Sequence, residues 1–402
     1  MRLMVIDRRR FMTAGLLAVA GGLGVNRLMA AGPASAQPVY SAAGVLSARP
    51  LYVAARKSGG RYEVAVFNSY GQVVQIVPLP DRGHSFALDP AGSRVVAFGR
   101  QPGFYAAVFN VAKGVADSYI AEGEDESGVT VMPELIKAAP GRHFFGHGVF
   151  ADQGRVMAAT ENDYENGRGV IGIYRSGNGD NGWRRVAELD CFGVGPHEMI
   201  LLPDGQTVCV ANGGLLTHPD YGKLVLNRAT MRPSLAYIDL ASGRLLEQVF
   251  LPEPFRQLSI RHLALDVRGK VWFGGQYEGP STHRLPLVGF HRRGEPLEFA
   301  VVPDESCWQG MRNYVGSVAA DAQGNYIATT SPLGGVVMIW HADSGKWAQT
   351  VMVPDGCGVA PATVSGFLLG SGQGDLWHAT DHLVQLAKSP VAWDNHIRRL
   401  ER

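Results

Sequence analysis

The stretch that decides the fold reads His197-Glu-Met-Ile-Leu-Leu-Pro-Asp-Gly205, and the chain repeats its pattern. Further copies open with His84-Ser-Phe-Ala-Leu, His147-Gly-Val-Phe-Ala and His262-Leu-Ala-Leu-Asp. In each copy an apolar run ends in a turn of Asp, Pro or Gly, and a second run rich in β-branched and aromatic residues follows. A repeat of this kind predicts a β-propeller in which each copy is one blade.

The number of copies predicts seven blades of four antiparallel strands each. The second runs begin near residues 51, 94, 155, 207, 270, 325 and 375. The last two copies open with Ser317 and Ser365 instead of histidine, and we place the first inner strand near residues 39–46. Glycine supplies 51 of the 402 residues, as a turn-rich chain requires. The fold class is therefore all-β, and residues 37–402 are expected to form a single propeller domain.

Residues 1–36 have the character of an export signal. Arg8-Arg9-Arg10-Phe-Met precedes a weakly apolar stretch, and Ala34-Ser-Ala36 supplies small residues for cleavage. Paired arginines before x-Phe-hydrophobe favour a twin-arginine signal over an ordinary secretory one, which remains the alternative. We expect a periplasmic protein that meets the twin-arginine translocase during export. Arg27 interrupts the apolar stretch, so stable membrane insertion is not expected.

The charge of the chain argues against a nucleic-acid partner. The formal net charge is +1, and only 18% of the residues are charged. Nucleic-acid binding would require a basic surface patch. The basic residues at the C-terminal end, Arg398, Arg399 and Arg402, are interpreted as a solvated tail.

Two cysteines are candidates for a disulfide. Cys307 and Cys357 follow the similar phrases Val-Pro-Asp-Glu-Ser and Val-Pro-Asp-Gly, which suggests equivalent loops of neighbouring blades. The periplasm permits disulfides, but bridging requires the two Cα atoms to lie within about 7 Å. Separate free thiols are the alternative.

The four histidines that open a repeat are the main functional candidates. The first strand of a propeller blade lines the central channel, so His84, His147, His197 and His262 should point toward one mouth. Imidazoles from separate strands are good ligands for copper, iron or zinc. Glu198 could add a carboxylate or orient an imidazole ring. The alternative is structural, because a histidine can also hydrogen-bond the turn where a blade begins.

Long segments between the second and third strands of the third, fourth and fifth blades are expected to emerge at the same mouth. They are residues 161–168, 213–233 and 276–286. Binding residues commonly lie on loops that a rigid scaffold positions. The ligand-binding candidates are Glu161, Tyr164, His218, Tyr277 and Glu278, together with Glu198.

Several phrases resemble one family closely, the exported bacterial propellers catalogued as domain of unknown function 1513. They include Gly141-Arg-His-Phe-Phe-Gly-His147, Thr160-Glu-Asn-Asp-Tyr164, Gly195-Pro-His-Glu198, Thr217-His-Pro-Asp-Tyr221 and Gln276-Tyr-Glu-Gly279. The resemblance covers essentially the mature chain and implies a seven-bladed propeller of the quinoprotein-like or YVTN-like kind. It also implies an association with periplasmic iron-uptake proteins and di-haem redox proteins, but no catalytic residues.

Three functions remain open at this point. The first is binding of a metal ion or small ligand at one channel mouth in periplasmic iron or copper handling. The second is an interaction scaffold for a periplasmic redox or metal-uptake partner. The third is a metal-dependent hydrolase of the propeller lactonase type, with Glu161, Asp163 and Asn212 as ligands. No Gly-x-Ser-x-Gly elbow or nucleophilic triad is present, so enzymatic activity remains an open question.

Overall fold

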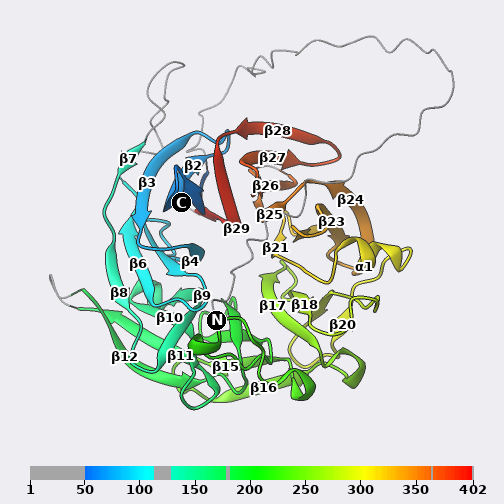
Figure 1. Ribbon diagram of the computed structural model, residues 1–402, viewed down its shortest axis with the longest axis horizontal. Helices are drawn as coiled ribbons and strands as arrows, with labels where there is room; N and C mark the ends of the chain where they lie inside the picture. The colour runs from blue at the N-terminus through cyan, green and yellow to red at the C-terminus, as the bar shows by residue number, and fades with distance from the viewer. Residues whose placement is uncertain (1–49, 113–127, 178–181, 364, 401–402) are drawn as a thin grey trace, which may run out of the picture. The chain divides into compact units, whose positions relative to one another are not determined.

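The computed structural model describes residues 50–112, 128–177, 182–363 and 365–400. These residues form seven sheets arranged around a common centre, which confirms the seven-bladed propeller (Figure 1). The centre is lined by the innermost strand of each sheet, including β4, β9, β17, β21, β25 and β29. The predicted export signal and the proposed strand near residues 39–46 lie outside the described residues.

Blades 2 to 6 follow the chain in order, and each contains four strands from the centre outward. Blade 2 has β4 (Gly83–Leu88), β5 (Arg94–Gly99), β6 (Tyr105–Asn110) and β8 (Glu134–Lys137); blade 3 has β9 (Arg142–Ala151), β10 (Val156–Asp163), β11 (Arg168–Ser176) and β12 (Trp183–Asp190); blade 4 has β13 (Pro196–Leu201), β14 (Thr207–Asn212), β15 (Ser234–Asp239) and β16 (Leu245–Phe250); blade 5 has β17 (Leu258–Leu265), β18 (Val271–Tyr277), β19 (Val288–His291) and β20 (Glu298–Phe299); blade 6 has β21 (Ser317–Ala320), β22 (Tyr326–Ser331), β23 (Val336–His341) and β24 (Trp347–Met352).

Blade 7 differs from the prediction by one strand. Its strands are β25 (Gly356–Pro361), β26 (Phe367–Ser371), β27 (Asp375–Ala379) and β28 (Leu383–Lys388). The run at residue 375 was predicted to be the second strand and is the third. Ser365 therefore precedes the second strand instead of opening the inner one, which is β25.

Blade 1 closes the ring with strands from both ends of the described chain. Its order is β29 (Val391–Leu400), β1 (Leu51–Ser58), β2 (Arg61–Asn68) and β3 (Val73–Leu79), with β7 (Val129–Thr130) added in parallel at the edge. Leu51 pairs with Leu400, so the innermost strand comes from the C-terminal end. This corrects two predictions: the inner strand is not supplied by residues 39–46, and Arg398 and Arg399 lie in a strand instead of a solvated tail.

The core lies between neighbouring blades, where the β-branched and aromatic residues of one sheet pack against the next. The largest cluster joins blades 4, 5 and 6 and includes Trp272 and Trp340, both fully buried. Helices are short: α1 (Ser306–Gly310) and the 3-10 turns η2 (Asp152–Gly154), η3 (Pro219–Tyr221), η4 (Arg228–Thr230) and η5 (Glu253–Phe255). No helix in these described segments has the length and apolar character to span a bilayer.

Candidate metal centre

Five histidines meet at the centre of the ring, one from each of blades 1 to 5. We call them the histidine cluster: His84, His147, His197, His262 and His396. Their side chains are buried, with residue exposures between 1% and 7%. Neighbouring ring centroids in the cluster are as close as 4.7 Å. The cluster therefore lies inside the propeller rather than on an open mouth.

A β-bulge lies at the histidine, or directly before it, in every one of these inner strands. The unpaired residues are 84–85 in β4, 145–147 in β9, 197–198 in β13, 261 in β17 and 394–396 in β29. A bulge bends the strand and re-aims the side chain at that point. Strand β21 pairs regularly from Ser317 onward and carries no histidine. The bulges thus turn the imidazoles toward the common centre.

Two contacts between blades hold the bulges in place. Thr160 Oγ1 donates to the carbonyl oxygens of His147 and His197, which joins blades 3 and 4. Gly146 has φ +102°, and a Cβ at this position would lie 2.5 Å from Cδ2 of His84. Only glycine combines this backbone conformation with so close an approach.

Glu198 lies between two of the imidazoles. Its Oε1 is 3.6 Å from Nδ1 of His147, and its Oε2 is 3.5 Å from Nδ1 of His262. Oε1 also accepts a hydrogen bond from Arg398, and Oε2 accepts one from the Leu263 amide. A carboxylate can only accept, so it favours a proton on each Nδ1 and leaves each Nε2 lone pair available as a ligand.

Asp394 has the same relation to His84. Its Oδ1 lies 3.8 Å from Nδ1 of His84, and its Oδ2 accepts a hydrogen bond from Arg82 Nε at 2.5 Å. Burial alone would raise the pKa of Asp394, but His84 and Arg82 lower it. Each buried carboxylate is thus shared between an arginine and the histidine cluster.

The imidazoles are neutral at physiological pH. Burial lowers the pKa of His84 to about 3 and that of His262 to about 4. Burial also lowers the pKa of His147, and those of His197 and His396 fall well below their usual range. Neutral imidazole is the form that binds a metal ion.

The donor atoms are close enough to share an ion. His84, His147 and His197 offer nitrogens within 4.8 Å of one another, and so do His147, His262 and His396. Three nitrogens that each lie about 2.1 Å from one ion are about 3.4 to 3.6 Å apart, so the rings would have to move together by about 1 Å to share it. His147 belongs to both groups.

Unsatisfied nitrogens are the second indication of a ligand. Nε2 of His147, Nδ1 of His197 and Nε2 of His396 are buried and have no hydrogen-bond partner within the described part of the chain. Buried polar atoms without partners cost free energy and call for an explanation. A transition metal fits these residues, because it would use nitrogen lone pairs that now contact nothing polar.

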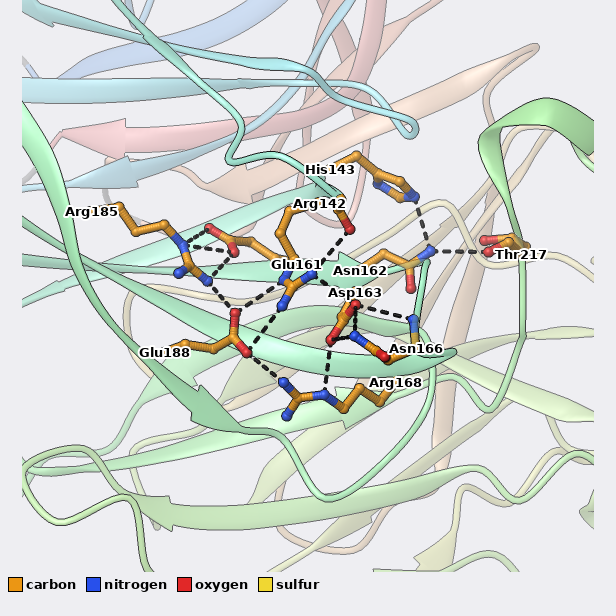
Figure 2. A network of polar contacts seen from close by, with 11 residues as sticks. Arg142, His143, Glu161, Asn162, Asp163, Asn166, Arg168, Arg185, Glu188 and Thr217 are labelled. Carbon is orange, nitrogen blue, oxygen red and sulfur yellow. Dashed lines mark hydrogen bonds and ion pairs between the residues drawn. The ribbon is translucent and has the colours of Figure 1, made fainter.

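The ligand-binding candidates of the long segments do not join this cluster. Glu161 lies in β10, because the strands run to Asp163 and from Arg168, so the predicted insertion is a short turn. Its carboxylate accepts hydrogen bonds from Tyr174 and Arg185. It belongs to an ionic network of blade 3, shown in Figure 2, whose members include Arg142, Asp163, Arg168 and Glu188.

The remaining candidates have local partners. The ring of Tyr164 stacks on the ring of His143, with centroids 6.0 Å apart, and contacts the ring of His218 edge-on. His218 caps the turn η3 by accepting from the Asp220 amide.

Two candidates lie beside β17. Tyr277 is hydrogen-bonded to His283 at 2.7 Å. Glu278 lies 3.5 Å from Arg228 and 3.9 Å from Arg261. Of the six predicted ligand-binding residues, only Glu198 touches the histidine cluster.

The lactonase ligand set does not converge. Asp163 is held by Arg142 and Arg168, whereas Asn212 bonds to the carbonyl oxygen of Cys191. Together with the use of Glu161 by Arg185, this leaves no common oxygen site for a cation.

The predicted disulfide is not formed. Cys307 and Cys357 are both free thiols. Cys307 lies on α1 against the core of blades 4 to 6, whereas Cys357 lies on β25 with its Sγ near the carbonyl oxygens of Gly370 and Trp393. The similar phrases before them lead into different elements, so the expected equivalence was wrong.

Sequence reasoning missed His396, Asp394 and Arg398. All three lie on β29, and the signal was present in the phrase Val391-Ala-Trp-Asp-Asn-His-Ile-Arg-Arg-Leu400. The run alternates like a strand and contains a histidine. No further strand-like runs follow it in the sequence, so the repeat pattern alone does not identify it as the inner strand of a blade.

Comparison with known proteins gives a family and a fold. A family model described as "Protein of unknown function (DUF1513)" matches residues 77–400. No curated protein matches the chain. Among solved structures, the chain is similar to hydrazine synthase from Kuenenia stuttgartiensis, with a TM-score of 0.54 and 13% identity over 88% of this chain and 99% of that one. At this identity the likeness shows the fold alone.

Proposed function

The chain belongs to the DUF1513 family, whose function is unknown, and from its own residues we propose that it binds a transition-metal ion at the centre of the propeller. The observation that carries the proposal is the histidine cluster: five buried neutral imidazoles, two of them facing one carboxylate and each with a buried nitrogen that has no hydrogen-bond partner among the described residues. Purely structural histidines would be expected to satisfy these atoms.

The donor set points to a class of metal. Imidazole nitrogen suits copper, iron, zinc and nickel, whereas magnesium and calcium require oxygen ligands. Glu198 and Asp394 would orient three of the rings from behind, an arrangement that raises the basicity of a ligating histidine. We favour copper or iron in a handling role, with zinc as the competitor that the experiment must exclude.

The setting of this function is proposed to be the periplasm. The support is the paired arginines at Arg8 and Arg9 before an apolar stretch. Twin-arginine export moves folded proteins, so the metal could be bound before export. A fusion of residues 1–36 to a reporter should reach the periplasm, and Arg8→Lys with Arg9→Lys should retain the reporter in the cytoplasm.

The test is the metal content of the full chain. After incubation with Cu(II), Fe(II) or Zn(II) and desalting, elemental analysis should find close to one ion per chain of the preferred metal. The combined variant His147→Ala, His197→Ala and His262→Ala should lose it. A matched control is His382→Ala, because His382 is exposed on blade 7 far from the inner strands. Equal metal content in the wild type and the triple variant, with circular dichroism showing both folded, would overturn the proposal.

An interaction scaffold is a second candidate, favoured by one observation. The segment between β14 and β15 exposes Tyr221, Leu224 and Leu226, with exposures of 61%, 58% and 45%. Exposed apolar residues close together on a long loop favour a protein-binding role, here for a periplasmic iron-uptake or di-haem redox partner. Replacing the three with serine should abolish association with such a partner while metal binding persists. Association unchanged by the substitutions would remove this candidate.

A further inference from the structure

Blade 6 carries no histidine, yet its inner strand contacts the closing strand of blade 1. Both strands, β21 and β29, line the centre of the ring (Figure 1). The hydroxyl oxygen of Ser317 on β21 lies 3.4 Å from Nδ1 of His396 on β29, and both residues are 1% exposed. The inner strand of blade 7, β25, lies between them and contacts both β21 and β29. The contact between Ser317 and His396 thus passes over β25 within the buried centre.

A second contact between the same two segments lies nearer to the solvent. Tyr314 lies just before β21 in the chain, and its hydroxyl oxygen accepts a hydrogen bond from Nδ2 of Asn395 at 2.8 Å. Asn395 lies directly before His396 and is 8% exposed, whereas Tyr314 is only half-buried. The side chain of Tyr314 therefore lies between the solvent and the histidine cluster on this side of the ring.

The backbone of Tyr314 is held by blade 5, so only its side chain reaches β29. Tyr314 forms an antiparallel bridge with Gln276 near the end of β18. The two residues before it, Arg312 and Asn313, have φ values of +49° and +58°. Successive positive φ values at residues other than glycine are strained, and strain of this kind gathers at clamps and switches. A strained segment thus aims the tyrosine at the closing strand.

Other partly exposed side chains near the cluster are held by charge. Arg82, with 44% of its side chain exposed, pairs with Asp394, and Arg398, with 24% exposed, pairs with Glu198. Hydrogen bonds between charged groups are roughly twice as strong as those between neutral groups. The hydrogen bond of Tyr314 is neutral, so of these three contacts it is the one that opens at the lowest cost.

We infer that Tyr314 is the gate of the histidine cluster: its side chain must rotate away from Asn395 before a metal ion can enter or leave. This inference rests on the proposed metal site and adds the route by which the ion reaches it. The cluster is buried, so an ion cannot arrive unless a covering side chain moves. A gate that closes equally over the empty and the occupied site changes the rates of binding and release together and leaves the affinity unchanged.

The first experiment measures Cu(II) binding to the full chain by the quenching of tryptophan fluorescence, and release of the ion into an excess of chelator. Tyr314→Phe keeps the ring and loses the hydrogen bond, so both rate constants should rise about fivefold, the factor that one neutral hydrogen bond represents. Tyr314→Ala also removes the ring and should raise both rates further. Tyr326→Phe is the matched control, because Tyr326 is an exposed tyrosine of the same blade whose ring contacts His341. The Kd should be the same in all four proteins.

A second experiment tests the gate without a metal. Diethyl pyrocarbonate carbethoxylates neutral imidazole nitrogens, and mass spectrometry of the peptides locates the products. His84 and His396 should react slowly in the wild type and faster in both Tyr314 variants. His382 is exposed on blade 7, so it should react at the same rate in every protein and serves as the internal standard.

The outcomes separate the gate from the metal site. Equal rates of binding, release and carbethoxylation in the wild type and both Tyr314 variants would overturn the gate and leave the metal site intact. A weaker Kd with an unchanged binding rate would also overturn it, because Tyr314 would then help to hold the ion instead of controlling its passage. Absence of Cu(II), Fe(II) and Zn(II) binding in the wild type would overturn the metal site, whereas the carbethoxylation rates would still support or overturn Tyr314 as the cover of the cluster.

Discussion

The molecule contains two buried polar networks that differ in how well they are satisfied. In blade 3, the carboxylates of Glu161, Asp163 and Glu188 each face arginines at short range (Figure 2). In the histidine cluster, nitrogens remain without partners and the nearest carboxylates are 3.5 Å or more from the rings. The first network is complete without a ligand and therefore stabilises the fold. The second leaves buried nitrogens without partners, which is why we propose the function there.

The largest effect on stability is expected from the complete network. Glu161→Ala would remove one of the two carboxylates that Arg185 pairs with and also the acceptor of Tyr174, at a cost of about 3 kcal/mol in the free energy of unfolding. Urea unfolding of the variant measures it. Arg155→Ala breaks an exposed pair and should cost less than about 1 kcal/mol. Metal content should be unchanged in both variants. Loss of metal in Glu161→Ala would show that the network of blade 3 and the histidine cluster are coupled, which would contradict the distinction.

Metal removal is expected to have the next largest effect. An ion that binds only the folded chain raises the free energy of unfolding by about 2.7 kcal/mol when its concentration is one hundred times its Kd. Chelation should therefore lower the melting temperature of the wild type. The variant with His147, His197 and His262 replaced by alanine should show no such decrease. A chelator effect of equal size in both proteins would place the metal elsewhere.

Glu198→Gln tests the residue behind the cluster. The amide keeps the shape but loses the charge that orients His147 and His262, so metal affinity should fall about 10- to 100-fold. Titration of metal into the purified variant measures the change. Thr207→Val in the neighbouring β14 is a matched control, since the Thr207 hydroxyl donates to the Asp204 carboxylate and lies outside the cluster. Unchanged affinity in Glu198→Gln would argue against an orienting role.

The smallest effect is the acid response of the complete network. Burial would raise the pKa of Glu188, but Arg142 and Arg185 lower it to about 2. Because the folded pKa is below the unfolded value of about 4.5, this stabilisation is present above pH 4.5 and is lost as the pH falls toward 2. Between pH 6 and pH 3 the free energy of unfolding of the wild type should fall by about 1 kcal/mol because of this group. Glu188→Gln lacks the carboxylate, so its free energy of unfolding should not show this decrease. Urea unfolding at pH 6 and pH 3 compares the two, and a constant difference would contradict the shift.

Local pattern predicted most of the fold. Six of the seven second strands were located correctly, because each carries its own run of β-branched residues and its own turn. His84, His147, His197 and His262 were correctly expected to converge, because equivalent positions of a repeat occupy equivalent places in a ring. Their binding of a metal stays a prediction.

The errors share a physical cause, which is pairing between distant parts of the chain. β29 is a strand because β1 supplies its hydrogen bonds. The two strands are neighbours in space, but almost the entire propeller sequence lies between them. Without that partner, Arg398 resembled part of a tail and His396 was overlooked. Because β29 belongs to blade 1, blade 7 begins and ends one strand earlier in the sequence than predicted. Ser365 therefore precedes the second strand of blade 7 and not the inner one. For Glu161, the partner Arg185 lies two strands away, and no local pattern distinguishes a buried ion pair from a loop ligand.

The closing strand also governs when the site can form during protein synthesis. β29 follows all the other strands in the chain, yet it supplies His396 to the cluster, Asp394 to His84 and Arg398 to Glu198. A growing chain that has completed blades 2 to 7 still lacks these groups. Closure of the ring and completion of the proposed metal centre are therefore one event, and a partly synthesised chain would lack part of that site.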